Sequence, residues 1–256
     1  MQLSAVIITF NEERNIGRCL DSLAGVADEI VVVDSFSTDR TEQICREKGA
    51  RFIQHAFAGH IEQKNFALSQ AQFPHVLSLD ADEALSDTLR QSILAVKTDW
   101  HCDAYSMNRL TNYCGQWIRH SGWYPDRKVR LFDRRRGHWG GLNPHDKVVM
   151  ETGTTLGFLA GDLLHYSYYS LEEHDARARK YAVIAARAML ARGKRGSWLR
   201  VALSPTFKFI RNYLLRLGFL DGRAGLMICH MAALETYWKY RHLIHLEKAQ
   251  KAGQRS

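Results

Sequence analysis

Short apolar runs alternate with helix-like stretches in the first part of the chain. Residues 3–9 (LSAVIIT), 29–34 (EIVVVD) and 76–79 (VLSL) are rich in β-branched and other apolar side chains, which predicts buried strands. Residues 51–54 predict a fourth strand, and helices are predicted after residue 11 and over about 40–48, 61–71 and 86–96. Strands that alternate with helices in this way predict β-α-β-α units and a parallel sheet.

Polar residues follow three of these strands directly. Asn11 comes after the first strand, Asp34 ends the second and Asp80 follows the central one. Because right-handed crossovers bring the carboxyl ends of parallel strands to one edge, these side chains are expected to face one crevice. Asn11 is also predicted to cap the following helix, with Glu12 and Glu13 in its first turn.

The central strand leads into three carboxylates, in the stretch Asp80-Ala81-Asp82-Glu83. Asp80 and Asp82 are two residues apart, so both can reach one cation, and carboxylate oxygens suit Mg²⁺ or Mn²⁺. Mg²⁺ is commonly held by one or two carboxylates together with substrate phosphates. One interpretation is therefore a metal that binds a diphosphate. The other is a polar loop that caps the next helix through Ser86.

Two common nucleotide-binding motifs are absent from the sequence. No G-x-G-x-x-G follows the first strand, and no G-x-x-x-x-G-K-[ST] occurs anywhere. This argues against a dinucleotide-binding Rossmann enzyme and against a P-loop NTPase.

Three stretches resemble the N-terminal motifs of family 2 glycosyltransferases, which have the GT-A fold. They are residues 6–12 (VIITFNE), 31–41 (VVVDSFSTDRT) and 79–83 (LDADE), in the family's order and with compatible spacing. The resemblance covers roughly residues 1–170. It implies an α/β fold of GT-A type, with a Rossmann-like, mixed, mostly parallel sheet and flanking helices. It also implies an inverting, Mg²⁺- or Mn²⁺-dependent transfer from a nucleotide-activated sugar.

The same resemblance implies roles for individual residues. Donor-nucleotide contacts are implied for Thr9, Asn11, Glu12, Asp34, Ser35, Lys64, Asp80 and Ala81. Asp34 would accept a hydrogen bond from the uracil imide of the donor. The metal would be held by Asp82 and Asp80, with His165 as a third ligand. The alternatives are an exposed Lys64 on an amphipathic helix and a structural His165.

An inverting transfer needs a base that takes the proton of the acceptor hydroxyl. Relatives often carry His-Glu where this chain has His145-Asp146. Asp146 is the preferred candidate for the base, and Glu83 is its rival. The alternative for Asp146 is a turn residue after Pro144.

The segment between residues 113 and 130 is rich in aromatic and basic residues. Aromatic faces suit sugar rings and arginine suits phosphate, although ordinary core packing also explains the tryptophans. The stretch GWYP, residues 122–125, resembles a loop of lipopolysaccharide-type members of the family. Acceptor binding is therefore predicted for Trp123, Tyr124, Arg127, Arg130 and His145.

Positive charge is concentrated in the last third of the chain. Residues 170–256 contain 17 Lys and Arg against 6 Asp and Glu, net +11, whereas residues 1–169 contain 18 against 21, net −3. We therefore predict a glycosyltransferase domain over 1–169 and a helical, basic region over 170–256. Its first helix is predicted over 171–192, with Ser170 and Glu173 as a capping box. Aromatic and apolar residues interleaved with cations then indicate helices that lie in a membrane interface. A helical pair packed on the sheet and a dimer interface are the alternatives.

Residues 219–225 (FLDGRAG) resemble a motif of bacterial glycosyltransferases that act on lipid-linked acceptors. The whole chain resembles the lipopolysaccharide inner-core β-glucosyltransferases, which add glucose to heptose. This implies a UDP-sugar donor, a lipid A-core acceptor and a peripheral location on the cytoplasmic face of the bacterial inner membrane, against anionic lipid. No signal peptide and no membrane span of about 18 apolar residues are predicted. The five cysteines have no metal-site spacing and are expected as free thiols in a reducing compartment.

Other functions fit parts of the sequence. They are a glycosyltransferase for another lipid-linked glycan, a nucleic-acid-binding protein that uses the basic third, and a nucleotidyltransferase. No RNP, KH or zinc motif is present, so no nucleic-acid partner is expected. No Gly-rich phosphate loop stands near the N-terminus, which argues against a nucleotidyltransferase. The oligomeric state is not predicted.

Overall fold

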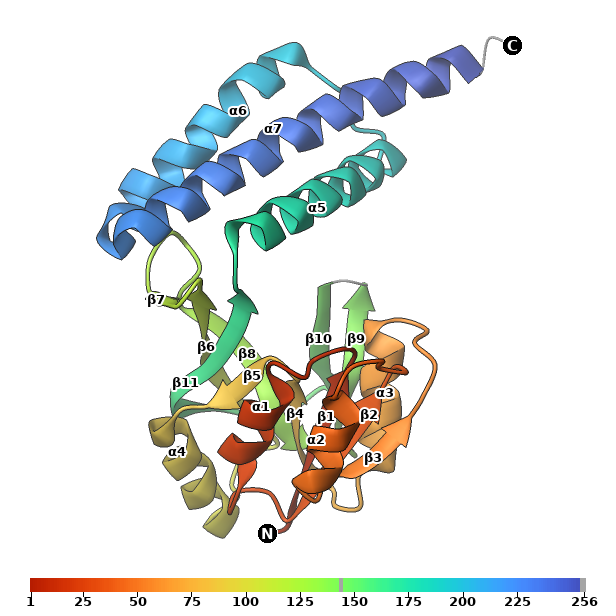
Figure 1. Ribbon diagram of the computed structural model, residues 1–256, viewed down its shortest axis with the longest axis vertical. Coiled ribbons are helices and arrows are strands. Elements are labelled where there is room, and N and C mark those ends of the chain that lie inside the picture. Colours follow the sequence, from red (N-terminus) through yellow and green to blue (C-terminus); the bar gives the residue numbers. More distant parts are fainter. Residues whose placement is uncertain (143–144, 254–256) are drawn as a thin grey trace. The chain divides into compact units, whose positions relative to one another are not determined.

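The computed structural model describes residues 1–142 and 145–253, and these form two compact units (Figure 1). The first unit comprises Met1–Leu110 and Pro125–Tyr166, and the second comprises Thr111–Tyr124 and the chain from Ser167 onward. The predicted boundary after residue 169 lies close to the junction that follows Tyr166. The segment Thr111–Tyr124, which the sequence placed in the first domain, is grouped with the C-terminal helices.

The first unit is built on a mixed β-sheet. Its strands have the order β3-β2-β1-β4-β8-β6-β11-β5. Pairing is parallel from β3 to β4 and antiparallel for β4–β8, β6–β8 and β5–β11. The strands are β1 Leu3–Thr9, β2 Glu29–Asp34, β3 Arg51–Gln54, β4 His75–Asp80, β5 Glu83–Leu85, β6 Ala104–Tyr113, β8 Asp126–Asp133 and β11 Leu156–Tyr168, with a separate hairpin of β9 Gly137–Leu142 and β10 His145–Met150. The predicted α/β fold is confirmed.

Helices cover both faces of this sheet, which is why its central strands are apolar at almost every position. The helices are α1 Ile16–Leu23, α2 Thr41–Glu47, α3 His60–Gln70 and α4 Asp87–Thr98. Alternate residues of β1 enter two separate cores. Leu3 and Ile7 pack in the cluster that contains α1, α2 and α4, whereas Val6 packs in the cluster that contains α3. The two-residue period of a strand divides the run between the two faces.

The segment after β1 differs from the prediction. Asn11 has a φ of 53°, in the left-handed region, and α1 begins only at Ile16. The Asn11 side-chain Oδ1 accepts a hydrogen bond from the backbone N–H of Thr38 at 2.8 Å. The prediction that Asn11 caps a helix with Glu12 and Glu13 in its first turn is therefore wrong. Asn11 joins the loops that follow β1 and β2 instead.

The second unit is a helical bundle with a short hairpin. β7, Gln116–Ile118, pairs with Thr111–Tyr113 of β6. The helices are α5 Leu171–Ala191, α6 Trp198–Ile210 and α7 Gly222–Gly253, with a π-helical turn η1 Arg211–Leu215 and a 3₁₀ turn η2 Gly218–Asp221 between the last two. α5 and α6 both pack along α7. Ser170 Oγ accepts a hydrogen bond from the N–H of Glu173 at 3.2 Å, so the predicted cap of α5 is confirmed.

The motif FLDGRAG, residues 219–225, spans the junction between η2 and α7. The buried Asp221 carboxylate accepts hydrogen bonds from the backbone N–H groups of Arg119, at 3.1 Å, and His120, at 2.9 Å. A Cβ on Gly225 would lie 1.9 Å from the carbonyl oxygen of Gly218, so only glycine fits there. Within the second unit, these residues therefore fix the β7 loop to the helices.

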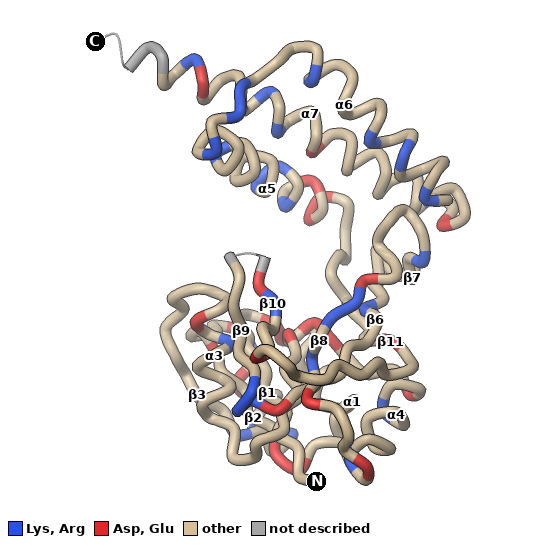
Figure 2. The backbone as a smooth tube through the Cα atoms, turned by 180° about the vertical axis from the view of Figure 1, so that it is seen from behind, with Lys and Arg blue, Asp and Glu red and all other residues tan. Residues whose placement is uncertain are grey.

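Lys and Arg residues outnumber Asp and Glu residues in α5, α6 and α7 (Figure 2). Within residues 1–142 and 145–253, no single helix has both the length and the apolar character of a membrane span. The pair Trp198–Leu215 and Gly218–Gln250, bent by 75°, meets that test only jointly and only by length and composition.

An aromatic cluster joins α5 to the β6–β7 hairpin within the second unit. The buried Tyr113 hydroxyl lies 2.9 Å from Nδ1 of His174. Trp123 and Tyr168 surround Tyr113, with ring centroids 5.8 and 5.7 Å from it. Burial lowers the pKa of His174 to about 4, aided by the charge of Arg177. The imidazole is therefore neutral in the folded protein at neutral pH.

The second unit should lose stability in mild acid because of His174. Between pH 6.5 and about 4 the unfolded chain binds a proton on this residue and the folded chain does not. The contribution of His174 to the free energy of unfolding is fully present above pH 6.5. It is lost as the pH falls to about 4, by on the order of 3 kcal/mol in total. Chemical denaturation of the wild type and His174→Asn across this range measures it. A difference between the two proteins that stays constant with pH would contradict the assignment.

Candidate active site

Thr9, Asp34 and Asp80 lie close together at the carboxyl ends of β1, β2 and β4, as predicted. Thr9 stands opposite Asp34 in the β1–β2 register, and Ile8 stands opposite Asp80 in the β1–β4 register. Thr9 Oγ1 is buried without a hydrogen-bond partner in the part of the chain that the structure describes. A buried hydroxyl without a partner is a natural contact point for a bound ligand.

Asp34 and Ser35 are held by neighbouring polar groups. Asp34 is fully buried, and its Oδ2 accepts a hydrogen bond from the N–H of Ser37 at 2.7 Å. The Ser37 hydroxyl donates to the other oxygen, Oδ1. Gln63 of α3 donates to Ser35 Oγ at 3.1 Å. Glu12 Oε2 accepts from the side-chain amide of Asn15 at 2.7 Å. The loops that would contact a donor nucleotide are thus fixed by their own hydrogen bonds.

Asp80 lies between two buried cations. Lys64 Nζ is 2.9 Å from Asp80 Oδ1, and Arg130 donates to Asp80 Oδ2 at 2.9 Å. Burial alone would raise the pKa of Asp80, but the charges of Lys64 and Arg130 outweigh it and hold that pKa well below its usual range. Asp80 is therefore ionised. Lys64 is itself buried, so the alternative of an exposed lysine on an amphipathic helix is wrong.

Glu83 is buried behind Asp80 and is surrounded by guanidinium groups. Arg130 donates to Glu83 Oε1 at 2.6 Å, and Arg109 lies 3.5 Å from the same oxygen. Glu83 Oε2 accepts from the backbone N–H of Asp80 at 3.0 Å. With a side-chain exposure of 0%, Glu83 holds the Asp80 turn and is more deeply buried than Asp146, whose side chain is 15% exposed. The role of base stays a prediction for both residues.

Asp146 stands on β10 and is joined to Asp80 through Lys64. Lys64 Nζ lies 2.7 Å from Asp146 Oδ2, and it also lies 4.2 Å from the ring centre of Trp139. One lysine of α3 thus bridges two carboxylates that are far apart in sequence. Asn143 and Pro144 and the side chain of His145 lie outside the described residues, and the predicted acceptor role of His145 falls among them.

Asp82 and His165 are brought together by a strand pairing. β5 runs antiparallel to β11 with Glu83 opposite His165, and Tyr166 donates its N–H to the Asp82 carbonyl at 2.9 Å. As a result, His165 Nε2 lies 3.3 Å from Asp82 Oδ2. A predicted metal-binding pair separated by more than 80 residues is therefore adjacent in the first unit.

The three predicted metal ligands do not form one cluster. Both oxygens of Asp80 contact cations, and no group of three or more His, Cys, Asp and Glu side chains is arranged for an ion within the described ranges. Asp82 and His165 supply a carboxylate oxygen and an imidazole nitrogen, both common metal donors. Two protein donors fit a divalent cation that takes its remaining ligands from substrate phosphates and water.

Two residues of this network were not predicted from the sequence. Trp139 of β9 donates from its indole N–H to Ser78 Oγ at 3.1 Å, and its backbone is bound in both directions by the side chain of Asn65. Arg109 of β6 binds Asp126 at 2.8 Å as well as approaching Glu83. Arg109 lies inside β6, and an arginine within a largely buried strand was the available signal. Trp139 gave no local signal.

The predicted acceptor residues do not all lie in the same unit. Arg127 and Arg130 belong to the first unit, where Arg127 stacks 4.7 Å from the ring centre of Phe158 and Arg130 is buried against Asp80. Trp123 and Tyr124 belong to the second, where Trp123 packs in the aromatic cluster of Tyr113. The acceptor role of these residues remains a prediction, and Arg130 faces the carboxylates of the candidate site.

Comparison with known proteins defines the class. The family model of Glycosyl transferase family 2 matches residues 4–154. An uncharacterized glycosyltransferase of Rickettsia prowazekii is 31% identical over 88% of this chain and 80% of its own. The Lipopolysaccharide core biosynthesis glycosyltransferase LpsC of Rhizobium meliloti is 29% identical over 94% of this chain and 93% of its own. The crystal structure of S. aureus TarS aligns with a TM-score of 0.47 and 20% identity, over 72% of this chain and 40% of that one.

The chain belongs to glycosyl transferase family 2. It is a glycosyltransferase, as the sequence predicted, and not a nucleotidyltransferase. It spans less than half the length of the solved TarS chain.

Proposed function

We propose that this enzyme transfers a hexose, glucose by its resemblance, from a UDP-sugar to a heptose of the lipopolysaccharide inner core, with inversion and with the help of Mg²⁺ or Mn²⁺. The observation that carries the proposal is the Asp82–His165 pair, which stands beside the Asp80–Lys64–Asp146 network at the end of β4. The name of the relative LpsC supports the acceptor class. Another lipid-linked glycan is the second acceptor class.

The two units would divide the work of this reaction. Thr9, Asn11 and Asp34, at the ends of β1 and β2, would bind the nucleoside. Asp82 and His165 would hold the metal, which when bound offsets the charge that develops on the departing UDP. The basic second unit would place the enzyme on the cytoplasmic face of the inner membrane, as its net charge of +11 over residues 170–256 favours.

Asp146 would act as the base. Its carboxylate takes the proton of the acceptor hydroxyl while that oxygen forms a bond to the anomeric carbon. The bond from this carbon to the UDP oxygen breaks, and UDP leaves with the electron pair. Attack from the face opposite UDP converts an α-linked donor into a β-linked product. Lys64, 2.7 Å from Asp146, would keep this carboxylate in position.

Calorimetric titration of UDP-glucose into the full chain, with and without Mn²⁺, tests the donor site. Asp82→Ala should weaken the Mn²⁺-dependent part of the binding by roughly tenfold or more, because one of the two protein donors is lost. Asp99→Ala, which removes an exposed carboxylate after α4, is the control and should bind as the wild type does. Nucleotide binding that is independent of metal in every variant would overturn the role given to Asp82.

A further inference from the structure

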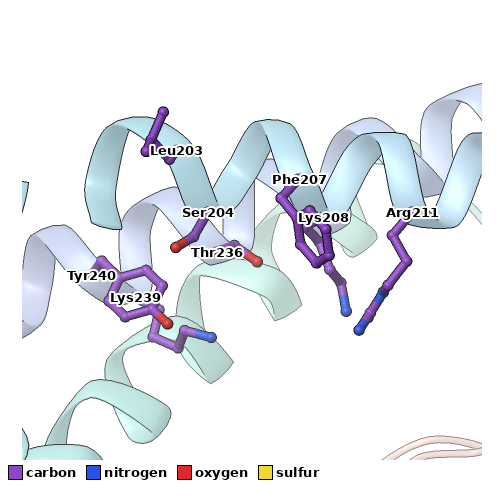
Figure 3. Close-up of a pocket in the computed structure, with 8 residues that line it drawn as sticks. All are labelled: Leu203, Ser204, Phe207, Lys208, Arg211, Thr236, Lys239 and Tyr240. Atoms are coloured by element: carbon purple, nitrogen blue, oxygen red, sulfur yellow. The ribbon is translucent and has the colours of Figure 1, made fainter. Parts of the chain in front are cut away.

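We propose that a pocket between α6 and α7 binds the phosphate of an anionic membrane lipid, while the neighbouring apolar stripe of α6 enters the acyl layer. The pocket lies entirely within the second unit and has a volume of about 410 Å³. It is lined by Leu203, Ser204, Phe207, Lys208, Arg211, Thr236, Lys239 and Tyr240 (Figure 3). The inference concerns a lipid site and does not depend on the reaction proposed above.

Three cations line this pocket. Lys208 and Arg211 come from α6 and its π-helical extension, and Lys239 comes from α7. Figure 3 shows their charged ends on the same side of the helix pair, while Leu203 points the other way. The hydroxyl of Ser204 lines the same pocket, and so does that of Thr236, which donates to the carbonyl oxygen of Ala232 at 2.8 Å. Cations beside a hydroxyl donor such as Ser204 are the chemistry that recognises a phosphate.

The cations of the pocket outnumber the carboxylates near them. Burial lowers the pKa of Lys208, and so does the positive charge of Arg211, while only Glu235 among its named neighbours raises it. Burial raises the pKa of Glu235 in turn. The residues that line the pocket include three cations and no Asp or Glu, so an anionic ligand would compensate their charge.

An exposed apolar stripe runs along α6 beside the pocket. It consists of Leu199, Leu203, Phe207 and Ile210, whose exposed fractions lie between 43% and 68%. At roughly 100° per residue, these four side chains fall within an arc of about 80°. Leu203 and Phe207 belong to both the stripe and the pocket wall. An unpartnered apolar face of this kind marks an interaction surface.

The apolar stripe and the cationic pocket together favour a lipid bilayer as the partner of this surface. Apolar side chains on one arc with cations along its border match the boundary between acyl chains and phosphate groups. Charge complementarity therefore favours anionic lipid over an acidic protein, which would leave the stripe in contact with polar groups. A second copy of this basic unit would bring like charges together.

Vesicle flotation of the purified full chain tests the site. The probe is phosphatidylcholine vesicles with and without a minor fraction of phosphatidylglycerol. The triple variant Lys208→Gln, Arg211→Gln, Lys239→Gln should bind the anionic vesicles about 100-fold more weakly, from roughly fivefold per cation. The matched control replaces Lys180, Arg187 and Lys194, exposed residues on or after α5, by glutamine and removes the same charge. The control should lose much less affinity.

Several outcomes would overturn the lipid site. Equal losses in the two triple variants would mean attraction by net charge alone. Binding of inorganic phosphate without binding to anionic vesicles would mean a free-anion site. Phe207→Ser should weaken vesicle binding and leave the oligomeric state unchanged by light scattering. If it dissociates an oligomer and leaves vesicle binding intact, the stripe is an interface between copies. Circular dichroism confirms that every variant is folded.

Discussion

Asp146→Asn should lower kcat for glycosyl transfer by about 10²–10⁴-fold, the range expected when a general base is lost. The amide keeps the size of the side chain but cannot take a proton from the acceptor hydroxyl. Donor affinity should change much less than kcat, because Lys64 still pairs with Asp80 at 2.9 Å. Steady-state kinetics with separated kcat and KM, together with donor titration, provide the measurement.

Two variants accompany this experiment. Glu151→Gln removes an exposed carboxylate just beyond β10 and should retain full activity. Glu83→Gln compares the rival base, whose carboxylate is buried against Arg130. If Asp146→Asn remains active while Glu83→Gln loses kcat without loss of fold, the assignment of the base is wrong. An α-linked product of the wild-type enzyme would contradict inversion itself.

Arg130→Met should lower the free energy of unfolding by about 3–5 kcal/mol, the cost of leaving buried charges without their partner. Arg130 is 3% exposed and contacts Asp80 at 2.9 Å and Glu83 at 2.6 Å. Arg109 is too distant from Glu83, at 3.5 Å, to replace the lost hydrogen bond fully. Urea denaturation of the full chain measures the change.

A second arginine–carboxylate pair, which is exposed, shows whether burial or ion pairing causes the expected loss of stability. Arg135 contacts Asp133 at 2.6 Å, as close as Arg130 is to Glu83, but its side chain is 65% exposed. Arg135→Met should therefore cost far less than Arg130→Met, because water screens the exposed pair. The double variant Arg130→Met, Glu83→Gln should be less destabilised than the sum of the single changes, because one unpaired charge is removed. Equal costs for the two arginines would show that burial is not the cause.

The sequence alone predicted strands β1 to β4 and helices α1 to α4 of the first unit, and the edge where the polar loops after these strands meet. β-Branched runs such as Leu3–Thr9 and Glu29–Asp34 need both faces covered, and the crossover rule then aligns their carboxyl ends. It also predicted the cap at Ser170 and, as one of two interpretations of the carboxylate stretch, the cap at Ser86, because a cap involves residues only three apart. The family motifs in this segment were sufficient for the class of enzyme, which the comparisons confirm.

The left-handed backbone conformation of Asn11 could not be predicted from the neighbouring residues in the sequence. Its side chain fits both a helix cap and a bridge to a second loop, and only the parallel pairing of β1 and β2 decides between them. The loop of the next strand supplies the N–H of Thr38, 27 residues away, and this removes Asn11 from the helix.

The tertiary structure decided which predicted site residues meet. Lys64 bridges Asp80 and Asp146, His165 reaches Asp82, and Glu83 is buried against Arg130. The contacts of Arg130 and His165 depend on the order of β8, β6 and β11 and on the antiparallel registers around them, whereas Asp146 is placed by the β9–β10 hairpin. A shift of one residue in such a register turns every side chain to the other face of the sheet. Local sequence patterns predict where a strand begins and ends but not which residues of other elements it meets. The site is built from residues that such tertiary contacts bring together, among them Lys64 of α3.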